Sequence, residues 1–118
     1  MSLFRPAGTN YIAVLDLANA ASWYVDKFGL RRYVTKFDDG QKGFELSESG
    51  EVFFVLGPSD VPTNNETPML YTSRIEKARN HLISRGVTVG EIQRDRQGTR
   101  FFEMRDLEGN VIEICDEP

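Results

Sequence analysis

The first half of the chain alternates apolar and polar residues with two different periods, which predicts a strand, a helix and three further strands. The expected elements are a strand at 8–15, a helix at 17–28, and strands near 30–36, 42–48 and 51–57. Asp16 is placed to cap the start of this helix, and Gly29 to end it. The apolar face of the helix comprises Leu17, Ala20, Ala21, Tyr24 and Phe28.

The second half repeats this order after a polar connection, PSDVPTNNET. The expected elements are a strand at 68–72, a helix at 74–85, and strands near 88–93, 99–105 and 110–115. Ser73 and Glu76 have the spacing of a capping box at the start of the second helix. The apolar face of that helix comprises Ile75, Ala78 and Leu82.

The two halves also share residues at a nearly constant spacing, which indicates an internal repeat. The matched pairs include Gly29 with Gly86, Ala21 with Ala78, Gly40 with Gly98, and Gly50 with Gly109. We therefore predict one domain, 1–118, built from two βαβββ modules at about 1–60 and 66–118 that share a core. Each helix can cover only one face of its sheet, so the other face should line a pocket or meet a partner subunit.

Composition narrows the function classes. The chain has 118 residues, 14 Lys plus Arg against 18 Asp plus Glu, and a formal net charge of −4 with no basic stripe. This balance argues against nucleic-acid binding. No apolar run reaches the length of about 20 residues that a membrane span needs, and we expect a cytoplasmic protein without membrane contacts. The single cysteine, Cys115, is expected to be a buried apolar residue.

Two stretches of the chain carry a resemblance to a known family. YIAVLDLANAASWYVDKFGL, with Asp16 eight positions before Tyr24, and the closing RDLEGNVIEI are similar to the opening and closing signatures of the vicinal oxygen chelate superfamily. That superfamily includes glyoxalases, bleomycin-resistance proteins and extradiol dioxygenases. The resemblance implies an α+β fold in which two tandem βαβββ modules form a curved eight-stranded mixed sheet around a cleft, with helices on the outer face. It also implies a homodimer.

The same resemblance implies where a metal would be held. In metal-using members the ligands come from the first and last strands of each module, and the matching positions here are Thr9, Phe54, Thr67 and Glu113. Only Glu113 keeps a family ligand, and the only histidine, His81, is expected at the edge of the second helix. Because hydroxyls are poor donors and phenylalanine is none, we expect no metal cofactor, and a divalent metal is disfavoured.

Alternation within the strands predicts which residues face the cleft. They are Thr9, Tyr11, Ala13, Val52, Phe54, Leu56, Thr67, Met69, Tyr71, Val111, Glu113 and Cys115. Of these, the predicted ligand-binding residues are Thr9, Tyr11, Phe54, Thr67, Met69, Tyr71 and Glu113. Glu45 and Glu103 would add a second acid pair if they also faced inward.

Glu113 is the candidate catalytic residue, and three roles stay open for it. It could be a structural acid held by Tyr11, Tyr71 or Arg100. It could recognise a ligand, or act as a general acid or base with a pKa raised by apolar surroundings.

The leading hypothesis is a metal-free small-molecule-binding protein similar to bleomycin-resistance proteins. The alternative is a glyoxalase-like lyase, isomerase or dioxygenase that uses Glu113 as a base or in an atypical metal site. A third hypothesis makes the fold a scaffold only. The sequence does not decide whether the protein is an enzyme.

Overall fold

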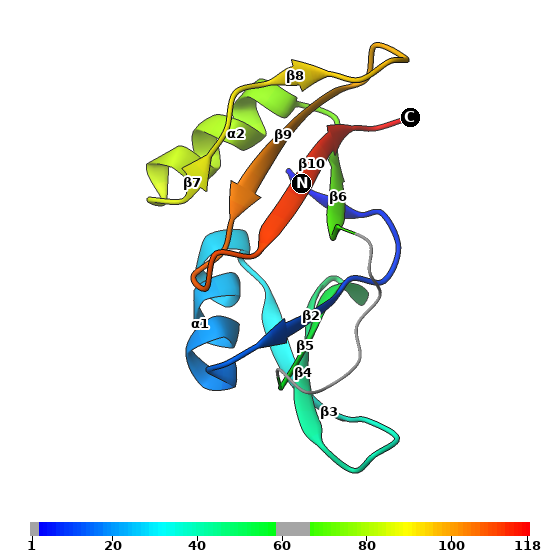
Figure 1. The fold of residues 1–118 in the computed structure, drawn as a ribbon, viewed down its shortest axis with the longest axis vertical. Coiled ribbons are helices and arrows are strands. Elements are labelled where there is room, and N and C mark those ends of the chain that lie inside the picture. The colour runs from blue at the N-terminus through cyan, green and yellow to red at the C-terminus, as the bar shows by residue number, and fades with distance from the viewer. Residues whose placement is uncertain (1–2, 59–66) are drawn as a thin grey trace. The chain divides into compact units, whose positions relative to one another are not determined.

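The computed structural model describes residues 3–58 and 67–118, which form two compact units (Figure 1). We call residues 8–58 module one, and residues 3–7 together with 67–118 module two. The repeat alone assigns the start of the chain to module one. In the structure, however, the short strand β1 (Arg5–Pro6) pairs with the first strand of module two's own repeat unit.

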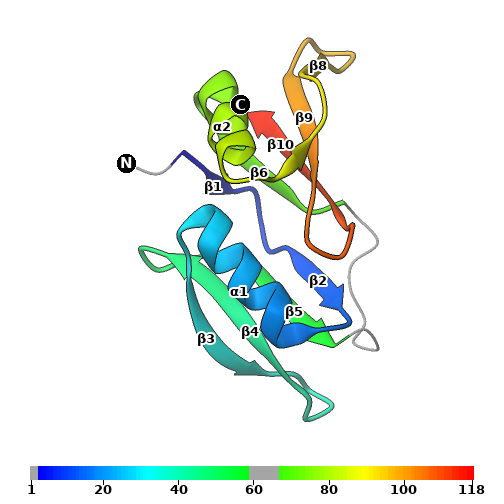
Figure 2. The same ribbon diagram turned by 90° about the vertical axis from the view of Figure 1, so that its left-hand side faces the viewer.

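Module one contains a helix and a four-stranded mixed sheet. Its elements are β2 (Tyr11–Val14), α1 (Leu17–Phe28), β3 (Arg31–Lys36), β4 (Lys42–Glu48) and β5 (Glu51–Pro58). The strand order is β2-β5-β4-β3, and only β2 and β5 run parallel. Helix α1 contacts β3, β4 and β5 and lies across one face of this sheet (Figure 2).

The first helix is confirmed with its predicted ends. An oxygen of Asp16, Oδ1, accepts a hydrogen bond of 3.1 Å from the backbone N–H of Asn19, which satisfies a donor of the first turn. Gly29 ends the helix with φ 68°, a left-handed conformation that glycine adopts without strain. The predicted apolar face is buried at Ala20, Ala21, Tyr24 and Phe28.

Module two has a six-stranded mixed sheet in the order β1-β6-β10-β9-β7, with β8 paired to β9. Its other elements are β6 (Met69–Thr72), α2 (Ile75–Ser84), β7 (Thr88–Val89), β8 (Gln93–Arg94), β9 (Arg100–Arg105) and β10 (Val111–Asp116). The prediction of one eight-stranded sheet is therefore corrected to two sheets. The predicted strand at 88–93 is divided around Gly90, and β1 is too short to show a periodic pattern.

The predicted capping box of the second helix is wrong. The residue at the cap position is Arg74, which makes no side-chain hydrogen bond there, and the Thr72 hydroxyl oxygen accepts a bond of 3.1 Å from the Arg74 N–H. Glu76 pairs instead with Arg100 at 2.8 Å. The predicted apolar face of Ile75, Ala78 and Leu82 is confirmed as fully buried.

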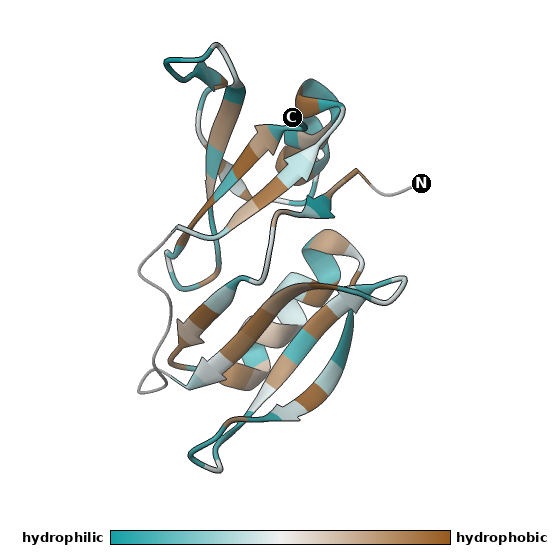
Figure 3. Cartoon of the chain, turned by 90° about the vertical axis from the view of Figure 1, so that its right-hand side faces the viewer, coloured by the Kyte–Doolittle hydropathy of each residue, from teal (hydrophilic) through white to brown (hydrophobic). Residues whose placement is uncertain are grey.

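Each module has its own apolar core between its helix and its sheet. The strands of both sheets carry apolar as well as polar residues (Figure 3), and buried positions alternate along β2, β6 and β9, so that one face of each sheet packs against the helix. The fully buried strand residues include Val14, Leu46, Phe54 and Leu56 in module one, and Leu70, Phe102, Met104, Ile112 and Ile114 in module two. Among the described residues, no helix is long and apolar enough to span a membrane.

Candidate functional site

The sheet face opposite the helix, which we call the open face, carries Glu113 in module two. Glu113 lies directly opposite Met69 on β6 and Glu103 on β9. Cys115, two residues further along β10, lies opposite Tyr71 and Phe101. Strand pairing therefore brings together the predicted residues Met69, Tyr71, Glu113 and Cys115, because residues paired across a ladder share a face.

The carboxylate of Glu113 accepts a hydrogen bond from the thiol of Cys115. Cys115 Sγ lies 3.3 Å from Glu113 Oε1, to which it donates, and 3.1 Å from Met69 Sδ. Burial, followed by the hydrogen bond and the charge of Glu113, raises the pKa of the Cys115 thiol to about 12. Cys115 is only 6% exposed, which confirms the prediction of a buried cysteine.

Arg100 bonds two other carboxylates, so it is ruled out as one of the three candidate partners of Glu113. Its guanidinium donates a hydrogen bond of 2.9 Å to Asp116 Oδ2 and another of 2.8 Å to Glu76 Oε1. These two carboxylates raise the pKa of Arg100 above its usual value. The reason is geometric: Arg100 starts β9 near Asp116 at the end of β10, whereas Glu113 lies further along the ladder, opposite Glu103.

In module one, Tyr11 lies on the open face but Phe54 does not. Tyr11 pairs with Val55 in the β2–β5 ladder and is 41% exposed. Phe54 is fully buried on the other face, with its ring centroid 4.8 Å from that of Tyr24 and 5.5 Å from that of Phe28. The prediction of Phe54 as a ligand-binding residue is therefore wrong, because its side chain belongs to the core beneath α1.

A β-bulge explains the error. The β4–β5 register shifts between Leu46 and Ser47, so that Phe53 is an extra residue between the turn and Phe54. One extra residue moves every following side chain to the opposite face. The position equivalent to Glu113 is consequently Val55, since Val55 pairs with Tyr11 and Glu45 as Glu113 pairs with Met69 and Glu103.

The two predicted threonines lie just outside the strands. Thr9 precedes β2 and Thr67 precedes β6, each by two residues, and both are exposed. The buried Asn10 holds the start of β2 in place through two hydrogen bonds. Its side-chain amide donates one of 3.1 Å to the carbonyl of Phe53, and its backbone carbonyl accepts one of 2.8 Å from the N–H of Val55. Thr9 and Thr67 thus border the open faces of their modules.

The residues at the family's metal positions do not fit a divalent metal. After the bulge correction they are Thr9, Val55, Thr67 and Glu113, a set with one carboxylate, two neutral hydroxyls and no donor at Val55. Within 3–58 and 67–118, no group of three His, Cys, Asp or Glu is placed to hold a metal ion. His81 lies on α2 with its ring 6.2 Å from that of Phe4, which agrees with its predicted place on that helix.

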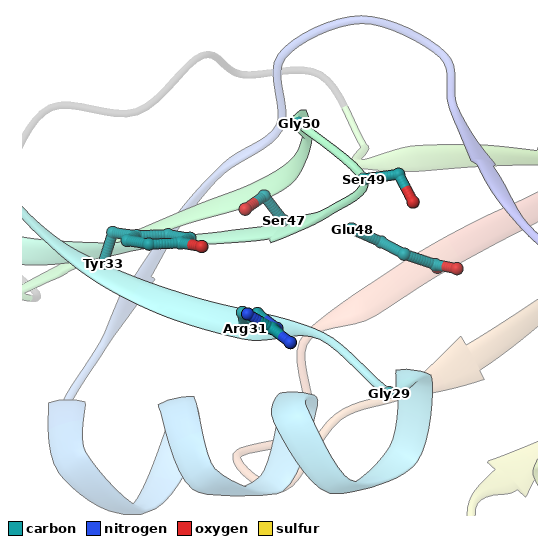
Figure 4. A pocket seen from close by; sticks show the side chains of 7 residues that line it. All are labelled: Gly29, Arg31, Tyr33, Ser47, Glu48, Ser49 and Gly50. Atoms are coloured by element: carbon teal, nitrogen blue, oxygen red, sulfur yellow. The ribbon is translucent and has the colours of Figure 1, made fainter.

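Among the described residues of module one, the cavities include two of similar size. One, of about 350 Å³, is lined by Arg31 and Tyr33 of β3, Ser47 of β4 and the turn at 48–50 (Figure 4). The other, of about 340 Å³, is lined by Tyr11, Thr35, Phe37, Glu45 and Val55, with Lys36 and Asp38 at the β3 hairpin. Sequence reasoning noted Glu45 but missed Phe37, which lies in a turn and has no periodic neighbours to assign its direction.

No family model matches the chain, and no curated protein is a significant match. Solved structures do match over nearly its whole length. They include a glyoxalase/bleomycin resistance protein/dioxygenase superfamily member from Sphaerobacter thermophilus, with 23% identity, 92% of this chain and 94% of that chain covered, and a TM-score of 0.73.

Two other matches carry functional names. TnmS3, an antibiotic binding protein from Streptomyces sp. CB03234, is 21% identical, with 93% of both chains covered and a TM-score of 0.72. Lactoylglutathione lyase from Agrobacterium tumefaciens is 20% identical, with 94% of both chains covered and a TM-score of 0.67. With two βαβββ modules, a helix on one face of each sheet and these matches, the chain has the fold of the glyoxalase/bleomycin resistance protein/dioxygenase superfamily.

Proposed function

We propose that this protein binds a small organic molecule without a metal, and that Glu113 on the open face of module two is a ligand-recognition group. The observation that carries the proposal is the setting of Glu113: a half-buried carboxylate among Met69, Tyr71 and Cys115. Apolar surroundings with a few polar groups are typical of small-molecule sites. A carboxylate in such a place can accept hydrogen bonds from a ligand and select against anions.

The donor set supports a metal-independent function. A catalytic metal site uses about three protein ligands and leaves a further position open. Glu113 alone supplies an anionic donor at the four family positions, and the hydroxyls of Thr9 and Thr67 are too weakly basic to complete the set. A ligand would therefore be held by hydrogen bonds and apolar contacts.

The structural neighbours support a binding function without assigning one. TnmS3 is named as an antibiotic binding protein, and its structure matches this chain with a TM-score of 0.72. At 21% identity this likeness extends to the fold, whereas binding by the present chain is argued from its own residues.

Elemental analysis tests the metal-independent part of the proposal. The protein would be purified without chelator, as wild type and as Glu113→Gln, and its content of zinc, iron, manganese, nickel and copper measured. We expect less than stoichiometric metal in both forms. One metal ion per chain in the wild type that is lost in Glu113→Gln would overturn the proposal, because Glu113 would then be a metal ligand.

A thermal-shift screen tests the binding part. The panel contains cationic aromatic compounds and small dicarbonyl metabolites, and a ligand at 100 times its Kd should add about 2.7 kcal/mol to the free energy of unfolding. We expect a hit whose shift is lost in Glu113→Gln and kept in Glu103→Gln. The second variant is a matched control, since Glu103 lies opposite Glu113 but is exposed. A panel in which no hit loses its shift in Glu113→Gln would contradict the role of Glu113.

The second candidate function is a glyoxalase-like lyase, isomerase or dioxygenase. The structural match to a lactoylglutathione lyase favours it, and Glu113 would act as a base on a carbon acid. The proton would move from the substrate carbon to a carboxylate oxygen of Glu113 and return to a neighbouring atom. Turnover of a dicarbonyl–thiol adduct by wild type but not by Glu113→Gln would favour this function over binding.

We also propose that the protein is a homodimer, in line with the family that it resembles. Light scattering on a gel-filtration column should then give twice the chain mass of 13.4 kDa. A mass of one chain at micromolar concentration would contradict this assembly.

A further inference from the structure

We propose that module one carries a second recognition site, in which the ring of an organic cation lies between Tyr11 and Phe37 and its ammonium group pairs with Glu45. We call the cavity at these residues the hairpin pocket, since it adjoins the β3–β4 hairpin. This inference rests on the proposed function. It adds the chemical class of a ligand and three residues that would contact it, Tyr11, Phe37 and Glu45. Neither Phe37 nor Glu45 was among the predicted site residues.

The strand ladders place the floor of the hairpin pocket on the open face. Glu45 lies directly opposite Val55 on β5, and Val55 in turn lies opposite Tyr11 on β2. The three side chains therefore form one row across three strands, with an acid, an apolar residue and an aromatic ring in sequence. The cavity above them is about 340 Å³, which is enough for a bicyclic amine.

The carboxylate of Glu45 has no bond to another described side chain. Glu45 is half-buried, yet among residues 3–58 and 67–118 its carboxylate makes no hydrogen bond or ion pair. Glu113, by comparison, accepts a hydrogen bond from the Cys115 thiol. A partly desolvated carboxylate is stabilised when a cation pairs with it, so Glu45 is suited to receive a charged donor from a ligand.

The wall formed by Phe37 is fixed by local geometry. The hairpin turn is closed by hydrogen bonds from the Phe37 N–H to the Gln41 carbonyl, 2.8 Å, and from the Gly40 N–H to the Phe37 carbonyl, 2.9 Å. The ring lies over Gly43, where an added Cβ would come 2.7 Å from Phe37 Cε2 and would also collide with the Leu56 carbonyl oxygen. Glycine at position 43 is thus what lets the ring lie against β4, beside Glu45.

The charges and rings together favour a cationic aromatic ligand. Glu45 and Asp38 are acidic and Lys36 is basic, so the pocket lining has a net formal charge of −1. Aromatic faces attract cations and stack on planar rings, and Tyr11 and Phe37 supply two of them. The neighbouring cavity in Figure 4 differs, because Arg31 and serine hydroxyls line it and Tyr33 is its only ring.

Isothermal titration calorimetry, which measures the affinity of three probes, tests the inference. Tryptamine is the cationic aromatic probe, indole-3-acetate replaces its charge by the opposite one, and cyclohexylmethylamine keeps the cation without the aromatic ring. We expect tryptamine to bind more tightly than either control. Glu45→Gln should weaken tryptamine binding roughly ten- to a hundredfold, as expected for loss of a charge-assisted hydrogen bond. Phe37→Ala should weaken it roughly three- to tenfold.

The control variants separate this site from others. Glu48→Gln removes an acid from the same strand but from the other cavity, and it should leave tryptamine affinity unchanged. Urea unfolding of each variant checks that a loss of binding is not a loss of folding. Equal affinities for tryptamine and indole-3-acetate, or the same loss in Glu45→Gln and Glu48→Gln, would overturn the inference.

The inference and the proposed function fail in different ways. If tryptamine does not bind the wild type while another compound binds and depends on Glu113, the hairpin pocket is not a cation site and the proposed function stands. If neither tryptamine nor any compound of the wider panel binds, both are wrong. If tryptamine binds and depends on Glu45 but not on Glu113, the inference holds, and the role of Glu113 is wrong only if no other compound of the panel depends on it.

Discussion

Cys115 illustrates how much a single side chain depends on its neighbours across the sheet. Its thiol contacts both Glu113 Oε1 and Met69 Sδ. Met69 belongs to β6, the strand next to β10 in the sheet. The sequence predicts a buried cysteine, because the residue ends an apolar strand. The contact with Met69 could not be predicted, since it depends on the register between two strands that are far apart in the chain.

The raised pKa of Cys115 makes a prediction about reactivity. With a pKa of about 12, the folded protein contains almost no thiolate at pH 8.5, and the thiolate is the nucleophile. Alkylation by iodoacetamide should therefore be much slower than in the urea-unfolded chain. Glu113→Gln should lower the pKa of the thiol, because it removes a negative charge and a hydrogen-bond acceptor. Equal alkylation rates in folded and unfolded protein would contradict this prediction.

The same pKa shift predicts a change of stability at high pH. The ordinary pKa of the thiol is 9.0, and the folded state raises it to about 12. Between these values the folded chain keeps a proton that the unfolded chain has lost, so the free energy of unfolding falls as pH rises through this window. Urea unfolding of wild type and Cys115→Ala at pH 8 and pH 10.5 measures the effect. We expect a smaller pH dependence in Cys115→Ala.

At the scale of elements, the two helices start with opposite capping chemistry at equivalent positions of the repeat. Asp16 bonds the Asn19 N–H and the Asn19 side chain, whereas Arg74 makes no capping bond. The sequence correctly predicts the first cap but assigns the second to Ser73, one residue too early. A pattern of capping residues locates a helix start only to within a residue or two, because backbone dihedrals decide which residue is the cap.

This asymmetry predicts opposite effects of two substitutions. Asp16→Ala should lower the free energy of unfolding by about 1 kcal/mol, since it leaves helix donors of α1 unsatisfied. Arg74→Asp should raise it by about 0.5–1 kcal/mol, because an acid at the start of α2 can accept a backbone N–H and favours the helix dipole. Urea unfolding measures both. Destabilisation by Arg74→Asp would show that the Thr72 hydroxyl already meets the need for a cap.

The β-bulge in β5 is the feature that most changes which residues belong to the candidate site. The four strands of module one lie close to their predicted places, yet the side chain of Phe54 points to the face opposite the predicted one. The hydrophobic pattern could not reveal this, because Phe53, Phe54, Val55 and Leu56 are all apolar. In a strand that is apolar on both sides, periodicity does not show where an extra residue enters.

At the scale of the whole molecule, the distinction between core and open face predicts different losses of stability when two aromatic residues are each replaced by alanine. Both residues, Phe54 and Tyr11, are predicted from the sequence to face the same cleft. Phe54→Ala should lower the free energy of unfolding by about 3–5 kcal/mol, since Phe54 is fully buried against Tyr24 and Phe28. Tyr11→Ala should cost less than about 1.5 kcal/mol, because Tyr11 is 41% exposed. Similar costs measured by urea unfolding would contradict the bulge assignment.

The sequence by itself determined the repeat, both helices with their buried faces, most strands, and the position of Glu113 on a sheet face with Met69 and Tyr71. Periodicity and turn residues are local properties, and a repeat shows them twice. Only the tertiary structure decided that Phe54 belongs to the core, that Arg100 pairs with Asp116, and that Phe37 and Glu45 share a cavity. Each of these depends on strand register or on a turn, where one residue more or less changes which side chains meet.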